Sequence, residues 1–237
     1  PQVHAFDDRS LMENLAPQGD TLRTARQFAG SKNIAVTPVT LRPRFNPQQK
    51  GPEPPALPGR LPARIDHRQP SLLAAAWTLG SLKYLAENRA ASITYFETHG
   101  WAGVMETARG SRMPELFASS PGMIFPLYHV LSDAAEFAGG ECVASSTSDP
   151  LRAVCLAMRR GNRVRVMAAN LTGSTQLLRI RNAGLGARFR LRRLDEDTFR
   201  SATTKPEEFR RSGALIASGE VEIALPPYAV ATADSAA

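Results

Sequence analysis

Hydrophobic residues follow two different patterns along the chain, and the pattern changes near Glu141. Before that point, short apolar runs alternate with stretches whose apolar residues recur at helical spacing. The predicted strands are residues 1–6, 34–41 and 91–101, and the predicted helices are residues 10–15, 21–28, 71–88 and 124–137. Strands that alternate with helices predict βα units with a parallel sheet. We therefore expect residues 1–140 to form the last βα units of a (β/α)8 TIM barrel, about three of the eight.

Beyond Glu141 the helical spacing disappears, and short alternating runs predict half-buried strands. These runs are residues 154–158, 163–170, 176–181, 189–194 and 221–225, with turns predicted at residues 160–162 and 172–174. Pro226 and Pro227 open a last run, which we expect to be an edge strand because proline cannot donate to a β-ladder. The fold expected for residues 141–237 is a small antiparallel β-sandwich, so the fold class of the chain is α/β plus all-β.

A proline-rich stretch separates the second predicted strand from the helix that follows it. Residues 46–70 contain seven prolines, a density that excludes both a helix and a central strand. In a barrel, a connection from strand to helix lies on the face that holds the active site. The stretch is therefore either a lid or wall of a substrate site, or a surface insert without a role in binding.

Charge and composition narrow the functional classes. The formal net charge is +7 and the isoelectric point is near 10.0. The basic residues are mostly arginines spread along the chain rather than gathered in one run, so we predict no nucleic-acid partner. No apolar stretch is long enough for a membrane span and the N-terminus lacks a signal segment, so we predict no membrane partner and a cytoplasmic location. The sequence starts inside a predicted strand, and we expect further barrel strands upstream of it.

Polar residues follow each of the predicted barrel strands, and the ends of parallel barrel strands open onto one face. Glu97 is the candidate general base, His4 the candidate acid or hydrogen-bond donor, and Arg42 the candidate clamp for a developing oxyanion. The remaining candidates, all for contacts with substrate, are Asp7, Arg44, Tyr95, His99 and Trp101. His99 could replace His4 in its role, and Arg44 could replace Arg42. The structural alternative is that Glu97 simply forms an ion pair with Arg42.

Metal and phosphate chemistry find little support in the sequence. His4, Asp7 and Asp8 are close together, but they do not have the spacing of a metal-binding motif. Residues 100–103 contain two glycines without the third glycine of a phosphate-binding loop. We predict no metal and no cofactor.

Several segments together resemble a known family. They are residues 36–45, 66–71, 77–86, 93–101 and 125–131, and the ending at residues 225–230. They are similar to the C-terminal half of bacterial D-apionate lactonases, which are TIM-barrel proteins related to glycoside hydrolases and carry a C-terminal β domain. The resemblance implies a hydrolase of carbohydrate catabolism that opens a sugar-derived lactone, D-apionolactone, to the sugar acid D-apionate. The implied partner is therefore a small sugar lactone or sugar acid.

A more distant resemblance connects the chain to retaining glycosidases with TIM barrels, which place a nucleophilic glutamate at the end of strand seven. The corresponding strand here ends in Thr40 and Leu41, so the carboxylate required for that mechanism is missing from this position. Two alternatives to the lactonase remain open: a glycoside hydrolase, and a fragment that binds carbohydrate without catalysis.

Overall fold

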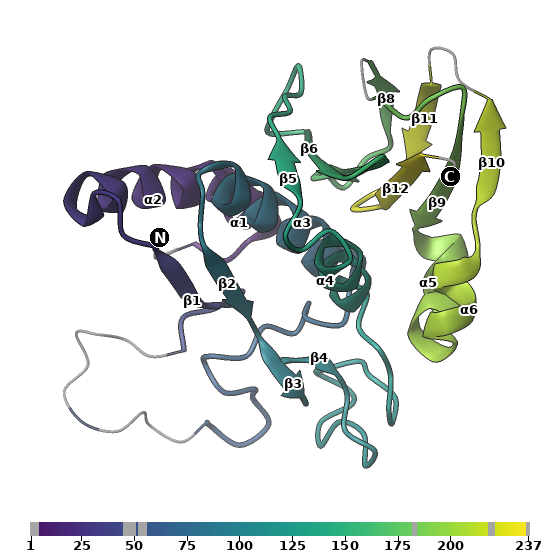
Figure 1. Ribbon diagram of the computed structural model, residues 1–237. Coiled ribbons are helices and arrows are strands. Elements are labelled where there is room, and N and C mark those ends of the chain that lie inside the picture. Colours follow the sequence, from purple (N-terminus) through teal and green to yellow (C-terminus); the bar gives the residue numbers. More distant parts are fainter. Residues whose placement is uncertain (1–4, 45–50, 52–55, 182–183, 218–220, 236–237) are drawn as a thin grey trace.

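The computed structural model describes residues 5–44, 51, 56–181, 184–217 and 221–235 (Figure 1). His4 and most of the predicted strand at residues 1–6 lie outside the described residues. So does part of the proline-rich stretch, whose described residues, 51 and 56–70, contain no helix or strand, as predicted. Helices and short parallel strands make up the first half of the described chain, and antiparallel strands dominate the second.

A parallel pair of strands forms the main sheet of the first half. β1 (Ala35–Val39) pairs with β2 (Ser92–Tyr95), with Ala35 opposite Ser92 and Val36 opposite Ile93. Parallel strands require a long crossover, and α3 (Leu72–Glu87) lies in the connection between them. The predicted order of strand, helix and strand is therefore confirmed.

Three helices pack together beside this pair (Figure 1): α1 (Asp8–Glu13), α2 (Ala16–Ala29) and α3. α3 is apolar around most of its circumference, and eleven of its sixteen residues are buried, as expected for a helix enclosed on several sides. Gly80 permits a close approach, since a Cβ at this position would lie 2.5 Å from Leu15 Cδ1. This helix is the centre of the layer.

The strand predicted over residues 91–101 is two strands. β2 ends at Tyr95, and Phe96 has a φ of +52°, in the left-handed region that interrupts a strand. β3 (Glu97–His99) then pairs with β4 (Gly103–Met105) in a separate sheet. The prediction of one continuous strand is therefore wrong, because the backbone turns at Phe96.

The last helix of the first half is α4 (Leu127–Ala135), which lies inside the predicted range of residues 124–137. It begins after Pro126, in keeping with the tolerance of helix starts for proline. α4 packs against α3 (Figure 1).

The second half contains a six-stranded antiparallel sheet in the order β10-β9-β12-β7-β6-β5 and a separate pair, β11-β8. The strands are β5 (Glu141–Val143), β6 (Ala153–Arg160), β7 (Arg163–Asn170), β8 (Gln176–Ile180), β9 (Arg188–Leu194), β10 (Ala214–Ala217), β11 (Val221–Leu225) and β12 (Val230–Ser235). All five strands predicted between residues 154 and 225 are present. Leu191 and Ala231 of the large sheet pack against residues of β8 and β11, so the antiparallel part has two layers.

Two predictions for this half are wrong. β12 is not an edge strand but pairs with β7 on one side and β9 on the other, because Pro226 and Pro227 precede the strand. The region also contains two helices where strands alone were expected, α5 (Glu196–Thr204) and α6 (Pro206–Arg211). Asp195 begins α5 with a capping box, in which it accepts from Thr198 N at 3.1 Å and donates to Thr198 Oγ1 at 2.9 Å.

One apolar core runs through both halves. The largest buried cluster includes Leu79 and Trp77 of α3, Leu156 of β6, Met167 of β7 and Phe209 of α6. α3 is in contact with both β6 and β7. The two halves therefore share buried surface and do not meet only through polar groups.

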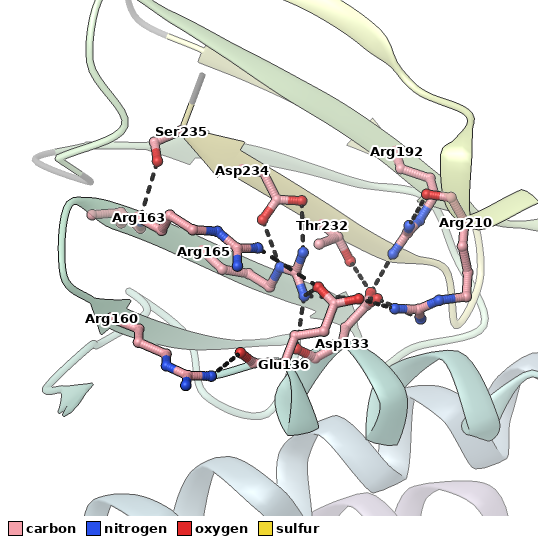
Figure 2. A network of polar contacts seen from close by, with 11 residues as sticks. Asp133, Glu136, Arg160, Arg163, Arg165, Arg192, Arg210, Thr232, Asp234 and Ser235 are labelled. Carbon is pink, nitrogen blue, oxygen red and sulfur yellow. Dashed lines mark hydrogen bonds and ion pairs between the residues drawn. The ribbon is translucent and has the colours of Figure 1, made fainter. Parts of the chain in front are cut away.

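A buried carboxylate joins the halves within this core (Figure 2). Asp133 of α4 is 1% exposed. Its Oδ2 accepts from Arg192 and from Thr232 Oγ1 at 3.0 Å, and its Oδ1 accepts from Arg210 at 2.8 Å. These donors lie on β9, β12 and α6, so a single side chain of the first half is bonded to three elements of the second.

The amide replacement Asp133→Asn keeps the shape of this residue but removes its charge. We expect it to lower the free energy of unfolding by about 3 kcal/mol, because Arg192 and Arg210 would keep their burial and lose their counter-charge. Urea unfolding measures the change. The matched control Asp20→Asn, in a salt bridge exposed on α2, should stay within about 0.5 kcal/mol of the parent. Equal effects of the two replacements would contradict the assigned role of Asp133.

A buried histidine makes stability depend on pH. His129 of α4 donates from Nε2 to the carbonyl oxygen of Ala202 at 2.9 Å if that nitrogen carries the proton, and its Nδ1 has no partner among the described residues. Burial lowers the pKa of His129 to about 4 from 6.5. The unfolded chain thus takes up the proton at higher pH than the folded chain does.

This difference predicts that stability is complete above pH 6.5 and declines as the pH falls toward 4, by about 3 kcal/mol from this residue. His129→Gln cannot titrate, so the loss of stability between pH 7 and 4.5 should shrink by about 2 kcal/mol relative to the parent. The comparison variant His99→Gln removes an exposed histidine of β3, and so separates the effect of burial from the loss of an imidazole as such. Chemical denaturation at several pH values checks this, and parallel curves for parent and His129→Gln would refute it.

Candidate functional site

A small polar hollow, with a free volume of about 20 Å³, lies beyond the carboxyl ends of β1 and β2. Arg42 and Arg44 follow β1, Glu97 and Trp101 follow β2, and Asp66 lies in the segment before α3. The other lining residues are Thr40, Leu41, Arg64, Gln69, Phe96 and Ala102. This edge of a parallel sheet is where sites form in barrel enzymes. The sequence-based prediction placed four of these residues in its site: Arg42, Arg44, Glu97 and Trp101.

Asp66 holds Arg42 in position. Asp66 is 3% exposed, and its Oδ2 accepts from Arg42 Nε at 3.2 Å and from Arg68 at 2.7 Å. Burial alone raises the pKa of Asp66, but the hydrogen bonds and charges of Arg68, with the charge of Arg42, outweigh it and leave that pKa below its usual value. Asp66 is therefore ionised at neutral pH, and the Arg42 guanidinium also lies 4.3 Å from the centre of the Phe6 ring.

The chain of hydrogen bonds continues into the second half. Arg68 donates to both oxygens of Asp66 and to Asp8, and Tyr228 Oη donates to Asp8 Oδ2 at 3.1 Å. Tyr228 lies between β11 and β12. Burial, followed by the charge of Asp8, raises the pKa of Tyr228 to about 12, so its hydroxyl keeps its proton at neutral pH. Arg42 is thus linked to the C-terminal half through three intermediates.

Glu97 forms an ion pair with Arg44 rather than with Arg42. Arg44 Nη2 lies 3.0 Å from Glu97 Oε1, and the two side chains are 47% and 49% exposed. An ion pair at this exposure contributes little to stability, on the order of 0–1 kcal/mol. Both groups are therefore open to solvent and able to change partners when a ligand enters.

The walls of the hollow are more rigid. Trp101 donates from Nε1 to Ser111 Oγ at 3.0 Å, and its ring lies 6.0 Å from that of Phe117. The buried amide of Gln69 donates to the carbonyl oxygen of Gly103 at 2.8 Å. Trp101 has the flat apolar surface on which a sugar ring could lie.

Three predicted site residues do not line the hollow. Asp7 is the N-cap of α1, where it accepts from Ser10 N at 3.0 Å, and these bonds to Ser10 lower its pKa. Tyr95 is directed at α3, where its hydroxyl lies 2.9 Å from Ser81 Oγ. His99 is exposed on β3. His4 lies outside the described residues, so its role stays a prediction.

Sequence reasoning overlooked Asp66, Arg64 and Gln69 as parts of the hollow. Their signal was weak but present, since Asp66-His67-Arg68-Gln69 ends the proline-rich stretch directly before a strongly apolar helix. A cluster of charged and amide groups at such a place is typical of a loop on the ligand face.

The hollow offers anion stabilisation and one available carboxylate. Among the residues described, its acidic members are Glu97 and Asp66, and Asp66 is engaged by two arginines. No cluster of three or more histidine, cysteine, aspartate or glutamate residues able to hold a metal occurs in the described ranges. Nor does any described helix have the length and apolarity to cross a membrane.

Solved structures show what this fold is similar to. A GH30 endoxylanase from Clostridium papyrosolvens matches with a TM-score of 0.57 and 12% identity over 95% of this chain and 46% of its own. A family 44 endoglucanase from Clostridium acetobutylium matches with a TM-score of 0.57 and 9% identity over 96% of this chain and 41% of its own. A GH39 β-xylosidase from Caulobacter crescentus matches with a TM-score of 0.52 and 14% identity over 92% of this chain and 48% of its own. The chain thus spans less than half of each of these proteins, and the likeness concerns the fold alone.

Two family models match the sequence. The first, described as D-apionate lactonase, TIM barrel domain, matches residues 1–139. The second, described as D-apionate lactonase, C-terminal immunoglobulin-like domain, matches residues 150–233. A search of curated proteins gives no match. The first half therefore corresponds to a TIM-barrel domain and the second to an immunoglobulin-like domain, and the chain belongs to the D-apionate lactonase family.

Proposed function

We propose that the protein is a carboxylic-ester hydrolase that opens a sugar-derived lactone, D-apionolactone, to its sugar acid. One observation carries the proposal: a solvent-accessible carboxylate, Glu97, and two guanidinium groups, Arg42 and Arg44, line the same hollow. Ester hydrolysis requires activation of water and stabilisation of an oxyanion, which these groups can supply. Family membership supports the same reaction class.

The residues suggest a sequence of steps. The lactone ring lies against Trp101, with its carbonyl oxygen toward Arg42. Glu97 takes a proton from a water molecule, whose oxygen attacks the carbonyl carbon, and the negative charge forms on the carbonyl oxygen beside the guanidinium. As this intermediate collapses, the bond from the carbonyl carbon to the ring oxygen breaks, and the ring oxygen receives the proton from Glu97. The product is a hydroxy acid.

Asp66 is a positioning residue in this scheme. Arg42 Nε is held by Asp66, which leaves the other donors of its guanidinium for a ligand. A fixed donor stabilises a developing charge without reorganisation during the reaction. Arg44 is more exposed, and it exchanges Glu97 for the substrate when the latter binds.

Two other functions have distinct tests. A glycoside hydrolase would turn over aryl glycosides, and a carbohydrate-binding fragment would be stabilised thermally by sugars without turnover. Of the two acids among the described lining residues, Asp66 is buried and held by two arginines, which leaves Glu97 as the only solvent-exposed carboxylate, whereas glycosidases of the usual mechanism need a pair of acids. We therefore favour lactone opening.

Glu97→Gln tests the proposed base. In the complete natural polypeptide, we expect the rate of D-apionolactone opening to fall about 100-fold or more, because the amide cannot accept the proton from water. The control Glu115→Gln changes an exposed glutamate outside the hollow and should keep the parental rate. Acid release followed with a pH indicator measures both. A Glu97→Gln variant with the parental rate would remove this residue from the mechanism.

Asp66→Asn tests the positioning role. We expect kcat to fall about tenfold with a smaller change in KM, because Arg42 loses the partner that fixes it for the transition state. Stability should also fall, by about 3 kcal/mol, since Arg68 and Arg42 lose a buried counter-charge. The stabilisation from Asp66 is present above the usual aspartate pKa and is lost as the pH falls through its lowered value.

Kinetics at a temperature where parent and variant are both folded separate the two effects. The control Asp149→Asn, in an exposed turn, should leave both quantities close to the parental values. A less stable Asp66→Asn variant with unchanged kcat would mean that Asp66 serves the fold only.

A further inference from the structure

A second hollow lies between the end of α4, α6 and one face of the C-terminal sheet. It has a volume of about 620 Å³, within the range of small-molecule sites, and it shares no lining residue with the hollow at β1 and β2. Its most frequent lining residue is arginine: Arg163, Arg165, Arg190, Arg192, Arg210 and Arg211.

Strand register explains why these arginines meet. Arg163 and Arg165 are two residues apart on β7, as are Arg190 and Arg192 on β9, so each pair projects from one face of the sheet. β12 lies between these strands, and its Asp234 is opposite both Arg165 and Arg190. The four side chains therefore share one face, while apolar residues such as Ala231 and Ala233 of β12 pack on the other.

Two of the arginines form a fixed floor (Figure 2). Arg165 donates to both oxygens of Asp234, at 2.6 and 3.0 Å, and to the carbonyl oxygen of Asp133 at 2.7 Å. Arg192 donates to the carboxylate of Asp133 and to the carbonyl oxygen of Arg210. Both are buried. Their positions do not depend on a ligand.

Charge in the hollow is not balanced. The acids in its lining are Glu136, Glu207 and Asp234, and Asp133 lies beneath them. Six arginines against four carboxylates leave a formal surplus of two positive charges. A cavity that keeps such a surplus attracts anions.

The surplus can be traced to two side chains. Arg190 is exposed and has no ion pair or hydrogen bond with any residue that the structure describes. Its side chain runs past Gly213, where an added Cβ would lie 3.0 Å from Arg190 Cγ. Arg163 reaches only to 3.8 Å from Glu136 Oε2 and makes no hydrogen bond through its side chain within the described ranges. Both guanidinium groups therefore retain their full donor capacity.

We propose that this hollow is a binding site for a small organic dianion, a phosphate monoester or a dicarboxylate, with Arg190 and Arg163 as its main contacts. Arginine matches both ligands because its fork of donors pairs bidentately with carboxylate and phosphate oxygens. Two charges on the ligand balance the surplus. This site is independent of lactone opening and would exist if the protein had another activity.

Isothermal titration of the complete natural polypeptide with methyl phosphate and with succinate tests the proposal. We expect one equivalent of at least one dianion to bind, and acetate to bind at least about tenfold more weakly because it carries a single charge. Binding of methyl phosphate would identify the ligand as a phosphate monoester, and binding of succinate would identify it as a dicarboxylate. Sodium chloride at matched ionic strength corrects for general screening.

Variants locate the site. Arg190→Gln and Arg163→Gln should each weaken binding about tenfold. Both variants should fold normally, because both side chains are exposed and Arg163 makes only a long, exposed ion pair with Glu136 and a contact with the Phe137 ring. Arg179→Gln, which removes an exposed arginine paired with Glu222 on β11, should bind as the parent does. Three results would each overturn the proposal. The first is a heat of injection for the dianions equal to that for sodium chloride. The others are acetate binding as tightly as the dianions, and an Arg190→Gln variant with the parental affinity.

Discussion

The arrangement of the two halves depends on one ionised side chain that is removed from water. Asp133 lies at the end of a barrel helix and accepts from donors on three elements of the immunoglobulin-like domain. An isolated buried carboxylate would be strongly unfavourable, so this position is stable only while the domain supplies its arginines. Burial of the shared apolar core stabilises the contact between the halves without favouring one orientation, whereas the hydrogen bonds of Asp133 depend on orientation. Because its bonds require specific partners, they fix how the C-terminal sheet is oriented on α4.

The same arrangement recurs at the candidate active site. Asp66 is buried, holds two arginines and leaves one of them facing a hollow, as Asp133 does for the second hollow. In the first hollow the buried acid limits the motion of a guanidinium that still has donors to offer, whereas in the second it fixes Arg192 beneath Arg190 and Arg163, which supply the free donors. A fixed cation recognises an anionic oxygen at a lower entropic cost than a mobile one, so the first hollow suits a group that becomes anionic, and the surplus of positive charge suits the second to anions.

Much of the first half could be predicted from its apolar runs, because α3 is apolar around most of its circumference and β1 and β2 are short β-branched runs on either side of it. Four of the candidate residues line one hollow, because polar residues at the ends of parallel strands meet on one edge of the sheet. The pairing of charged side chains within this hollow could not be predicted. Arg42 is bonded to Asp66, twenty-four positions along the chain, and nothing local indicates that this pairing leaves Glu97 to Arg44.

The short elements were missed for other reasons. α5 and α6 are each less than three turns long, so they show no sustained periodicity, although Asp195 and Pro206 are good helix starts and acids precede bases along α6. Tyr95 was placed in the site as a member of the predicted strand at residues 91–101, but the alternation of side chains directs it to α3. The turn at Phe96 changes that alternation, and sequence alone does not reveal a left-handed residue other than glycine.

The bonds that run from Tyr228 through Asp8, Arg68 and Asp66 to Arg42 have a thermodynamic consequence. If occupancy of the barrel pocket alters the free energy of this relay, linkage requires that disturbance of the β11–β12 loop alter ligand affinity by the same amount. The C-terminal domain then affects ligand binding at the first hollow without contacting the ligand. Its influence on Arg42 is then reciprocal, so removal of the domain would change the affinity of a ligand at the hollow beside β1 and β2.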